Sequence, residues 1–509
     1  MLREISLNLD IGENIFFSII EKFKNDNSTY LKYYTASRLI REYSFHSFYE
    51  KVLSFTKYLQ EDKQLSKYDK VVVSLGNSDF TLITYSAIML LGAVIVPVDP
   101  SLNDDELKYI IKNSQSKHII DSKFDANFFD SLVHDPNYQP NKVSLEDEAL
   151  IVYTSGTTSA SKGVVLTYKN LLSNASSVIK HHKIEVSSTN MCVLPLFHVN
   201  AFNLSYFASL CSKSKLILNK NFYLPNFWDI IENEKVNMVS IVPKIVTILL
   251  QDTRIFNKNL ADLNYFISAA APLSKESAKQ FYERYGIRVL QGYGMSEAVN
   301  FSTTMPINLS EKEYVDLLEE ELLSIGVALT ENAVYVLDEN DRQLGENEIG
   351  EIAIIGENVM KSYYNNEQAT DQTLKNGYLH TGDRGFYKLK GNKKFYYLVG
   401  RMKELIIKNG ENIAPVELDN KLKPLQGLEQ CVTVGFENKY TGEEIGLYVV
   451  RNDATPSSED ILKISQELLG KKAPKVVVFG DKIPTTATGK IQRLKLTQFF
   501  SQFKDIYYQ

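Results

Sequence analysis

The sequence has 509 residues, of which 44% are hydrophobic and 23% are charged, and this composition excludes a disordered chain and suits two or more domains with their own cores. The formal net charge of -6 provides no overall positive field, so neither nucleic acid nor an acidic membrane is an expected partner. The three cysteines are too few and too scattered for a disulfide framework or a zinc cluster, which favours a reducing, cytoplasmic location; they are Cys192, Cys211 and Cys431.

The sequence shows neither a signal peptide nor a membrane-spanning helix. The N-terminus carries Glu4 and has no apolar stretch of signal-peptide length, so secretion is not indicated. The longest apolar run, over 82–98, is interrupted by Gly92 and Pro97 and falls short of the roughly 20 residues that a spanning helix needs. We therefore expect no membrane span, but a buried helix that ends at Gly92 and is followed by a buried strand.

Short β-branched segments alternate with helical patterns through the first part of the chain. A strand over 71–75, a helix over 78–91, a strand over 93–98 and a helix over 103–113 give a βαβα rhythm, and Asn103 with Glu106 resembles a capping box. Further strands are predicted over 118–120, 238–242, 265–267 and 288–290. The sequence therefore predicts an α/β fold, with mostly parallel strands covered by helices.

The pattern changes after Ala333. Strands over 334–337, 351–355 and 395–399, separated by acidic turns rich in glycine and asparagine, predict an antiparallel subdomain. The acidic run over 311–321 is interpreted as the solvated face of one helix. Beyond Arg401 the pattern becomes mixed again.

Hydroxyl residues and a glycine follow the apolar residues 151–153, and a lysine comes after them; these residues are Thr154, Ser155, Gly156, Thr157, Thr158 and Lys162. Glycine lets backbone amides approach an anion, hydroxyls donate hydrogen bonds, and lysine supplies a charge that can follow a polyphosphate. The spacing differs from that of the ordinary P-loop. A phosphate-binding loop is one interpretation, and a solvated linker also fits this composition.

Three further polar motifs follow strand-like segments, at 268–273, 291–297 and 377–383, and open parallel sheets bind ligands at such strand ends. The glycines around Tyr293 let an aromatic ring lie beside a flat base, Ser296 can donate to a phosphate, and Glu297 can hold Mg²⁺. Each motif alone also fits a turn or a cap. Residues 484–490 again present hydroxyls, glycine and Lys490, which suggests one polyanion contacted by two loops.

Together these segments resemble the adenylate-forming superfamily, which includes acyl- and aryl-CoA ligases, peptide-synthetase adenylation domains and beetle luciferase. The resemblance extends from residues 90–100 through 151–164, 194–198, 268–273, 291–297, 377–383, 400–406 and 410–415 to Lys490. It implies a large N-terminal domain over 1–400, of two helix-covered sheets plus a small β-barrel over roughly 325–400. It also implies a small, mobile α+β C-terminal domain over 401–509, with a hinge near Lys403.

The resemblance also implies ATP and Mg²⁺ as cofactors and roles for individual positions. Residues 154–162 would hold the β- and γ-phosphates, and Asp383 and Arg401 would take the ribose hydroxyls. Lys490 would be the catalytic cation, Ser296 would contact the α-phosphate and Glu297 would bind Mg²⁺. The rest of the nucleotide would lie against Ala270, Ala271, Gly292, Tyr293, Gly294 and Met295.

The acid site is less well specified. The resemblance places His198 near the acyl pocket and the thiol tunnel, as a further catalytic candidate, although a lone histidine also fits a structural role. Many peptide-synthetase domains have aspartate where this chain has Val199, which disfavours an amino-acid substrate. The acid pocket would be lined by His198, Asn203, Ala269, Gly292 and Gly294.

Two positions of the phosphate loop depart from the family. Ser159 and Ser161 stand where relatives usually have glycine and proline, so a residue free of steric limits and one with a fixed φ are both lost. Because residues 154–158 and Lys162 remain, we expect the loop to stay active.

Three functions are open at this point. The first is a carboxylic acid–CoA ligase, in which acid and ATP give acyl-AMP and pyrophosphate and the CoA thiolate then displaces AMP. The second is a stand-alone acid:carrier-protein ligase; because Lys490 lies only 19 residues from Gln509, its carrier protein would act in trans. The third, a non-catalytic nucleotide-binding descendant, is disfavoured because every catalytic position of the family is present.

Overall fold

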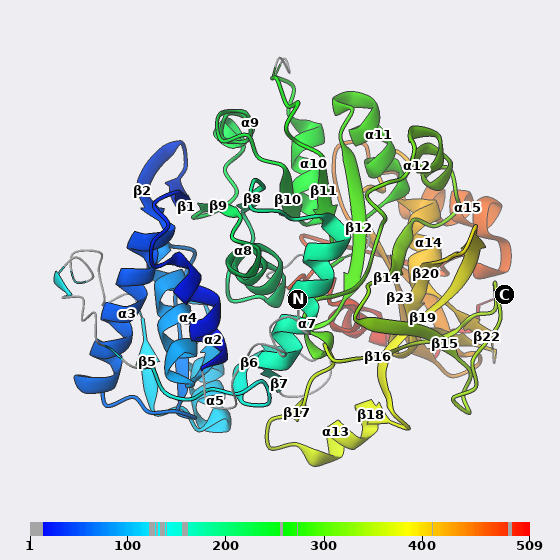
Figure 1. The fold of residues 1–509 in the computed structure, drawn as a ribbon. Helices are drawn as coiled ribbons and strands as arrows, with labels where there is room; N and C mark the ends of the chain where they lie inside the picture. Colours follow the sequence, from blue (N-terminus) through cyan, green and yellow to red (C-terminus); the bar gives the residue numbers. More distant parts are fainter. Residues whose placement is uncertain are drawn as a thin grey trace.

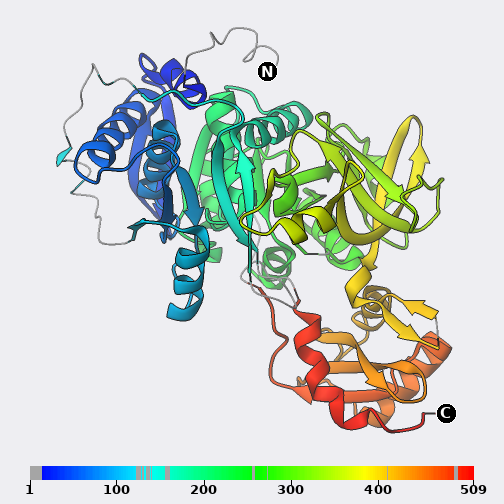
Figure 2. The ribbon, with the colours of Figure 1, turned by 90° about the horizontal axis from the view of Figure 1, so that it is seen from below.

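The computed structural model describes residues 14–121, 128, 131–132, 138, 140–154, 161–254, 258–271, 273–409, 411–486 and 491–508. Its described strands form two large sheets with helices between them and a smaller sheet near the C-terminus, which lies to one side (Figure 1 and Figure 2). This arrangement confirms the predicted α/β fold. No helix within these ranges is long and apolar enough to cross a membrane.

One large sheet contains the predicted βαβα segment. Its strands, in order, are β17 (Ser362–Tyr363), β7 (Lys162–Thr167), β6 (Glu148–Thr154), β4 (Val94–Pro97), β3 (Lys70–Val73) and β5 (His118–Ile120). Helices α3 (Phe45–Glu61) and α4 (Asp79–Leu91) pack on one face and α5 (Asp104–Ser114) on the other, which completely buries the valines of β3. As predicted, α4 ends at Gly92, which has a φ of 72°.

The start of α5 differs from a full capping box. Asn103 Oδ1 accepts from the backbone N–H of Glu106 at 3.0 Å, and the Glu106 carboxylate accepts from Asn103 Nδ2 at 2.8 Å. The Glu106 side chain is therefore bonded to the Asn103 side chain, whereas in a full capping box it would accept from the Asn103 backbone N–H.

The other large sheet is mixed. Its largely parallel half, in order, consists of β2 (Arg38–Ser44), β1 (Thr29–Thr35), β9 (Lys215–Asn219), β8 (Thr189–Cys192), β10 (Met238–Ile241), β11 (Tyr265–Ser268) and β12 (Arg288–Gly294). It continues into antiparallel strands β13 (Phe301–Thr304), β14 (Ser324–Ala328), β20 (Lys393–Arg401), β19 (Tyr378–Lys390), β16 (Gly350–Gly356) and β15 (Asn332–Leu337), with β18 (Leu374–Lys375) beside β19.

Helices α7 (Tyr168–His182) and α8 (Ala208–Ser212) and the π-helix η2 (Asn200–Phe207) lie between the two large sheets. The Tyr168 hydroxyl donates to the carbonyl oxygen of Met89 at 2.7 Å, and the hydroxyls of Tyr206 and Ser86 lie 2.7 Å apart. Both contacts reach α4, so the helix layers of the two sheets form one core.

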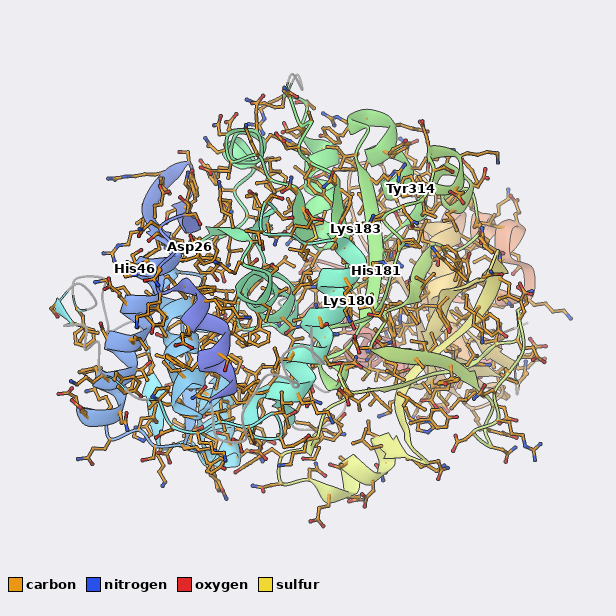
Figure 3. All side chains as sticks on the ribbon, viewed as in Figure 1. Asp26, His46, Lys180, His181, Lys183 and Tyr314 are labelled. Carbon is orange, nitrogen blue, oxygen red and sulfur yellow. The ribbon has the colours of Figure 1, made fainter. Side chains whose placement is uncertain are left out.

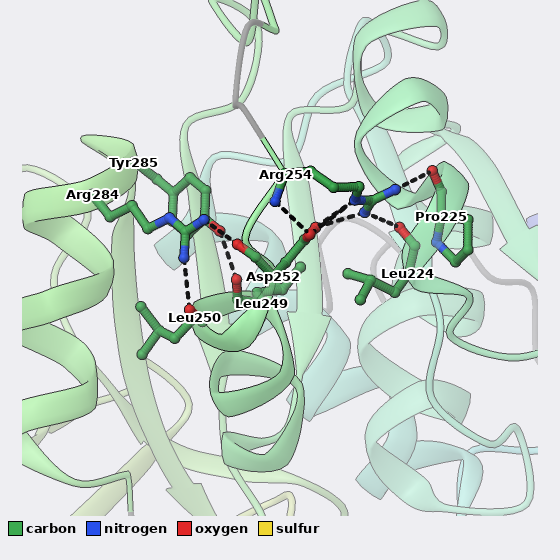
Figure 4. Close-up of polar contacts among 8 residues, drawn as sticks. All are labelled: Leu224, Pro225, Leu249, Leu250, Asp252, Arg254, Arg284 and Tyr285. Atoms are coloured by element: carbon green, nitrogen blue, oxygen red, sulfur yellow. Dashed lines mark hydrogen bonds and ion pairs between the residues drawn. The ribbon is translucent and has the colours of Figure 1, made fainter.

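Helices α9 (Leu224–Asn233), α10 (Pro243–Gln251) and α11 (Lys275–Tyr285) cover the opposite face of the mixed sheet. Asp252, just after α10, pairs with Arg254 at 2.6 Å, and Arg254 donates to the carbonyls of Leu224 and Pro225 on α9 (Figure 4). The first part of the acidic run forms α12 (Glu311–Leu318), whereas Glu320, beyond the helix end, pairs with Lys388 and Lys390 of β19, so the run is not one solvated helix face. Tyr314 of α12, labelled in Figure 3, accepts a hydrogen bond from the backbone of β12.

The antiparallel half of the mixed sheet curls back on itself. Asn332, at the start of β15, donates from Nδ2 to the carbonyl oxygen of Ser302 on β13 at 2.9 Å. The curl encloses a small apolar cluster that includes Tyr293, Val334, Ile352 and Tyr396. This half therefore has its own core, separate from the large core of the parallel half.

The C-terminal sheet consists of β22 (Glu411–Ile413), β21 (Ile406–Lys408), β24 (Gly442–Val450), β23 (Cys431–Asn438) and β25 (Val476–Gly480), the last paired with β24. Helices α14 (Pro415–Leu422) and α15 (Ser458–Leu469) and the 3₁₀ segment η6 (Arg493–Phe503) pack on it. Its apolar clusters contain no residue before Ile406 among the described residues, so this sheet also has its own core.

Candidate active site

Three residues that the sequence assigns to the nucleotide meet at the end of β12. Asp383 of β19 and Arg401 of β20 oppose each other in the antiparallel ladder. The Tyr293 hydroxyl donates to Asp383 Oδ2 at 2.8 Å, and Arg401 Nε lies 3.1 Å from Asp383 Oδ1. Burial and then the Asp383 charge raise the pKa of Tyr293, so its hydroxyl remains a donor. Each carboxylate oxygen keeps a lone pair for a further donor, such as a ribose hydroxyl.

The ends of β11 and β12 next to this group carry the residues predicted to lie against the rest of the nucleotide. A Cβ at Gly294 would lie 1.5 Å from the carbonyl oxygen of Asn300, so only glycine fits the close approach of β12 and β13. Ala270, just after β11, is exposed and has a φ of 72°, and Ala271 is partly exposed. Tyr293 is 7% exposed, and Met295 packs against the same cluster. Most of the Tyr293 surface is therefore used in packing.

Glu297 lies in the 3₁₀ turn η3 (Ser296–Ala298) and is 8% exposed. Its Oε1 accepts from the Tyr363 hydroxyl at 2.7 Å, and its backbone carbonyl accepts from the N–H of Met360 at 2.7 Å. The turn ends at Val299, whose φ of 65° and ψ of −59° form a γ-turn that is strained for a β-branched residue. Such strain persists only where surrounding contacts impose it, so Glu297 is firmly positioned.

The hairpin of β6 and β7 places Thr154 opposite Lys162. Ser161 Oγ donates to the carbonyl oxygen of Thr154 at 2.7 Å, and the Tyr109 hydroxyl donates to the carbonyl oxygen of Ser161 at 2.8 Å. Lys162 Nζ lies 4.8 Å from the centre of the Tyr363 ring. Ser296, predicted for the α-phosphate, begins the turn that carries Glu297. The remaining residues predicted for phosphate binding lie outside the described residues; they are Ser155, Gly156, Thr157, Thr158 and Lys490.

These residues fit a magnesium ion that is shared with a nucleotide. Glu297 offers hard oxygen ligands, and its Oε2 receives no hydrogen bond from a described residue. No group of three or more His, Cys, Asp or Glu side chains in the described ranges could hold a metal ion alone. Since Mg²⁺ is usually held by one or two carboxylates together with substrate phosphates, a single carboxylate suffices here.

His198 and Asn203 lie just before and within η2. Burial lowers the pKa of His198 to about 4, against a weaker opposite effect of Asp99, so the imidazole is neutral at pH 7. Asn203 Nδ2 donates to Asn174 Oδ1 at 2.8 Å. His198 Nε2 and Asn203 Oδ1 are buried without a hydrogen-bond partner among the described residues. Buried polar atoms are rarely left unpaired, so both are candidate contacts for a polar ligand.

The space beside Gly292 is filled. A Cβ at Gly292 would lie 2.5 Å from the ring of Phe301, which occupies the room that a small residue at 292 leaves. Ala269, after β11, is 7% exposed. Phe301 is 1% exposed and packs in the main core, so its ring takes the room that the resemblance implies for the acid beside Gly292. This contact is not visible in the sequence, because it depends on the pairing of β12 with β13.

Lys403, the predicted hinge residue, lies in η4 (Met402–Glu404), between the last strand of the mixed sheet and the first of the C-terminal sheet. Next to it, Glu404 Oε2 lies 3.4 Å from Arg493 Nε. Arg493 is 5% exposed, and its Nη2 lies 2.9 Å from Asp419 Oδ2. One buried arginine thus joins the turn at the predicted hinge to α14, and it stands three residues after Lys490.

Comparison with known protein families gives one match over most of the chain. A family model described as AMP-binding enzyme matches residues 24–364. The matched range contains the phosphate loop, His198 and the turn with Glu297. Asp383, Arg401 and Lys490 lie beyond it.

Curated proteins and a solved structure are similar over nearly the full length. The chain is 30% identical to sulfoacetate–CoA ligase of Cupriavidus necator, over 84% of this chain and 86% of that protein. It is 29% identical to feruloyl-CoA synthase of an Amycolatopsis species, over 85% of this chain and 89% of that protein. ATP-bound MatB of Rhodopseudomonas palustris shares the fold, with a TM-score of 0.87, 24% identity, and coverage of 97% of this chain and 100% of that one.

Proposed function

The chain belongs to the AMP-binding enzyme family and is an AMP-forming acid–thiol ligase, and we propose that it converts a carboxylic acid to its CoA thioester through an acyl-adenylate. The observation that carries this proposal is the group of Tyr293, Asp383 and Arg401. Tyr293 lies at the end of β12, and the turn with Glu297 follows it directly, whereas Asp383 and Arg401 lie on β19 and β20. The hydrogen bond from Tyr293 to Asp383 therefore links the proposed ribose contact to the segment that carries the proposed metal ligand.

In the proposed first step, a carboxylate oxygen of the acid attacks the α-phosphorus of ATP. The bond from that phosphorus to the bridging oxygen breaks, pyrophosphate leaves, and acyl-AMP forms. In the second step, the thiolate sulfur of CoA attacks the acyl carbon, and AMP leaves with the electron pair of the carbon–oxygen bond. When bound, Mg²⁺ would neutralise phosphate charge. Positioning and charge neutralisation supply most of the catalysis in such reactions.

The proposal assigns a role to each of five residues, as the resemblance implies. Lys162 would hold the β- and γ-phosphates together with the loop before it, Ser296 would donate to the α-phosphate, and Glu297 would bind Mg²⁺. Lys490 would bridge the carboxylate and the α-phosphate. Neutral His198 would contact the acid or the thiol through Nε2, as a donor or an acceptor and not as a cation.

The proposed domain boundary lies in η4, where Lys403 separates the mixed sheet from the C-terminal sheet. Rotation of the backbone at Lys403 would move Lys490 out of the active site. It would bring the surface around Asn409 into the active site in its place. Both curated relatives described above are named as CoA ligases or synthases, which supports CoA over a carrier-bound phosphopantetheine as the acceptor.

A pyrophosphate-release screen tests the proposal. Aryl, short, medium and long carboxylic acids are offered with ATP and Mg²⁺, each with CoA, with a holo-carrier protein, and with neither. We expect at least one acid to release pyrophosphate and CoA to increase AMP release from it. No pyrophosphate with any acid would refute adenylation, and a response to the carrier alone would refute CoA as the acceptor.

A further inference from the structure

A short segment crosses from one large sheet to the other and contacts both phosphate-site elements. It leaves the mixed sheet after β16 and ends as β17, beside β7 of the other sheet. Among the hydrogen bonds that hold it, two reach the turn that carries Glu297 and two reach β7: Asn358 Nδ2 to Ala298 O at 3.2 Å, Met360 N to Glu297 O at 2.7 Å, Lys361 N to Val165 O at 3.0 Å, and Tyr364 N to Gly163 O at 2.7 Å.

Tyr363 is the residue of this segment whose side chain reaches both elements. Its hydroxyl donates to Glu297 Oε1 at 2.7 Å, and its ring centre lies 4.8 Å from Lys162 Nζ. The side chain is 6% exposed. The Tyr363 hydroxyl therefore contacts the proposed metal ligand, and its ring contacts the proposed phosphate ligand.

The two contacts differ in chemistry. The hydroxyl orients a carboxylate that otherwise rotates about its own side-chain bonds, in the way that outer partners orient metal ligands. The face of the Tyr363 ring attracts the ammonium group of Lys162 and restricts its position. Glu297 lies in the turn after β12 of the mixed sheet, and Lys162 lies on β7 of the other sheet. One aromatic side chain contacts the charged groups of both.

We propose that Tyr363 is a positioning residue that holds Glu297 and Lys162 in register, so that the metal end and the terminal phosphates of a Mg²⁺–nucleotide are bound together. This inference rests on the proposed function, because it assigns Glu297 to the metal and Lys162 to the phosphates. It extends that function by naming the residue that couples the two.

The test compares Tyr363→Phe, which removes only the hydroxyl, with Tyr363→Leu, which also removes the ring. Tyr168→Phe is the matched control, because it removes a buried hydroxyl with a hydrogen bond of the same length, 2.7 Å, to a distant helix. The binding readout is the rise in Tm of the full-length protein with ATP at increasing Mg²⁺. KM for ATP and kcat of pyrophosphate release are measured with an accepted acid.

For Tyr363→Phe we expect the Mg²⁺ concentration of half-maximal Tm rise to increase about tenfold, as is typical when the outer partner of a metal ligand is lost. The response to ATP without Mg²⁺ should remain. Tyr363→Leu should in addition raise KM for ATP about threefold to tenfold, the range of a lost cation–π contact. Tyr168→Phe should leave both quantities at wild-type values.

The contrary outcomes are separable. If wild-type protein neither binds ATP nor releases pyrophosphate, the proposed function is wrong and this inference falls with it. If wild-type protein is active and Tyr363→Phe keeps the wild-type Mg²⁺ dependence, the inference alone is wrong. An equal fall in unliganded Tm for Tyr363→Phe and Tyr168→Phe, without a change in Mg²⁺ dependence, would assign Tyr363 a structural role only.

Discussion

The hydroxyl of Ser161 donates a hydrogen bond of 2.7 Å to the carbonyl oxygen of Thr154, across the base of the loop between β6 and β7. The family resemblance noted in the sequence leads one to expect proline at this position, which would restrain the backbone by fixing φ. In this chain, a hydrogen bond from the side chain restrains the two ends of the loop instead. The Tyr109 hydroxyl holds the Ser161 carbonyl from outside the hairpin.

Ser161→Ala should therefore loosen the loop. A neutral hydrogen bond contributes about 1 kcal/mol, so we expect KM for ATP to rise about threefold to fivefold with little change in kcat. Ser161→Pro should restore the wild-type KM, because the ring replaces the lost restraint. Ser212→Ala, which removes a bond of 2.8 Å within α8, is the control. If KM for ATP rises as much in Ser161→Pro as in Ser161→Ala, restraint of the loop does not explain the role of Ser161 in ATP binding.

His198 should stay neutral throughout the pH range of the enzyme. Burial lowers its pKa to about 4, compared with about 6.5 in an unfolded chain. The folded state thus binds this proton more weakly than the unfolded chain does. His198 therefore lowers the free energy of unfolding progressively as pH falls below about 6.5. The ring resonances should not titrate between pH 5.5 and 8 in NMR spectra.

His198→Ala should lower kcat/KM for the acid about tenfold, the effect of losing one buried polar contact. The pH profile between 6 and 8 should keep its shape. A wild-type inflection near pH 6.5 that disappears in the variant would show that the imidazole is charged during the reaction, contrary to its burial.

The ion group of Asp419, Arg493 and Glu404 should govern the acid stability of the C-terminal sheet. Burial alone would raise the pKa of Asp419, but Arg493 holds it below its usual range. A carboxylate whose folded-state pKa is lowered adds stability above its unfolded value of about 3.9, and this stability is lost as pH falls through the folded-state value.

Asp419→Asn leaves the Arg493 charge buried and less well paired, so we expect a loss of about 3 kcal/mol near pH 7 and a weaker acid transition. Amide hydrogen exchange in β23, whose Thr433 N–H donates to Asp419 at 2.6 Å, reports on this sheet alone. Asp316→Asn removes an exposed pair at 2.6 Å and should cost under about 1 kcal/mol. Equal effects of the two changes would contradict the assigned role of burial.

The sequence predicts the parts of this site that follow a local pattern. The resemblance points to Asp383 and Arg401 through their local motifs, but their pairing across β19 and β20 is a finding of the structure, because no strand is predicted over 378–390. Tyr363 and Phe301 could not be predicted, because their positions depend on which strands become neighbours. Val299 is a further case: a β-branched residue at positive φ contradicts its own propensity, and it closes a turn in which the Asn300 N–H donates to the Ala298 carbonyl oxygen at 2.8 Å.

Lys490→Ala should separate the two half-reactions. The ends of its loop are closed by a bridge between Thr485 and Ile491 and by a hydrogen bond of 2.9 Å from Gln492 N to Pro484 O. Since these contacts do not involve the lysine side chain, removing it should leave the base of the loop intact. A cation that neutralises charge developing only during adenylation affects only that step.

We therefore expect pyrophosphate release by Lys490→Ala to fall about a hundredfold or more, while thioester formation from supplied acyl-AMP and CoA stays near the wild-type rate. Lys482→Ala changes an exposed lysine just before the loop and should affect neither step. Amide exchange in β23 should match wild type, which excludes loss of the C-terminal fold. Equal loss of both half-reactions would mean that Lys490 serves them in one arrangement of the domains, and rotation about Lys403 would then be unnecessary.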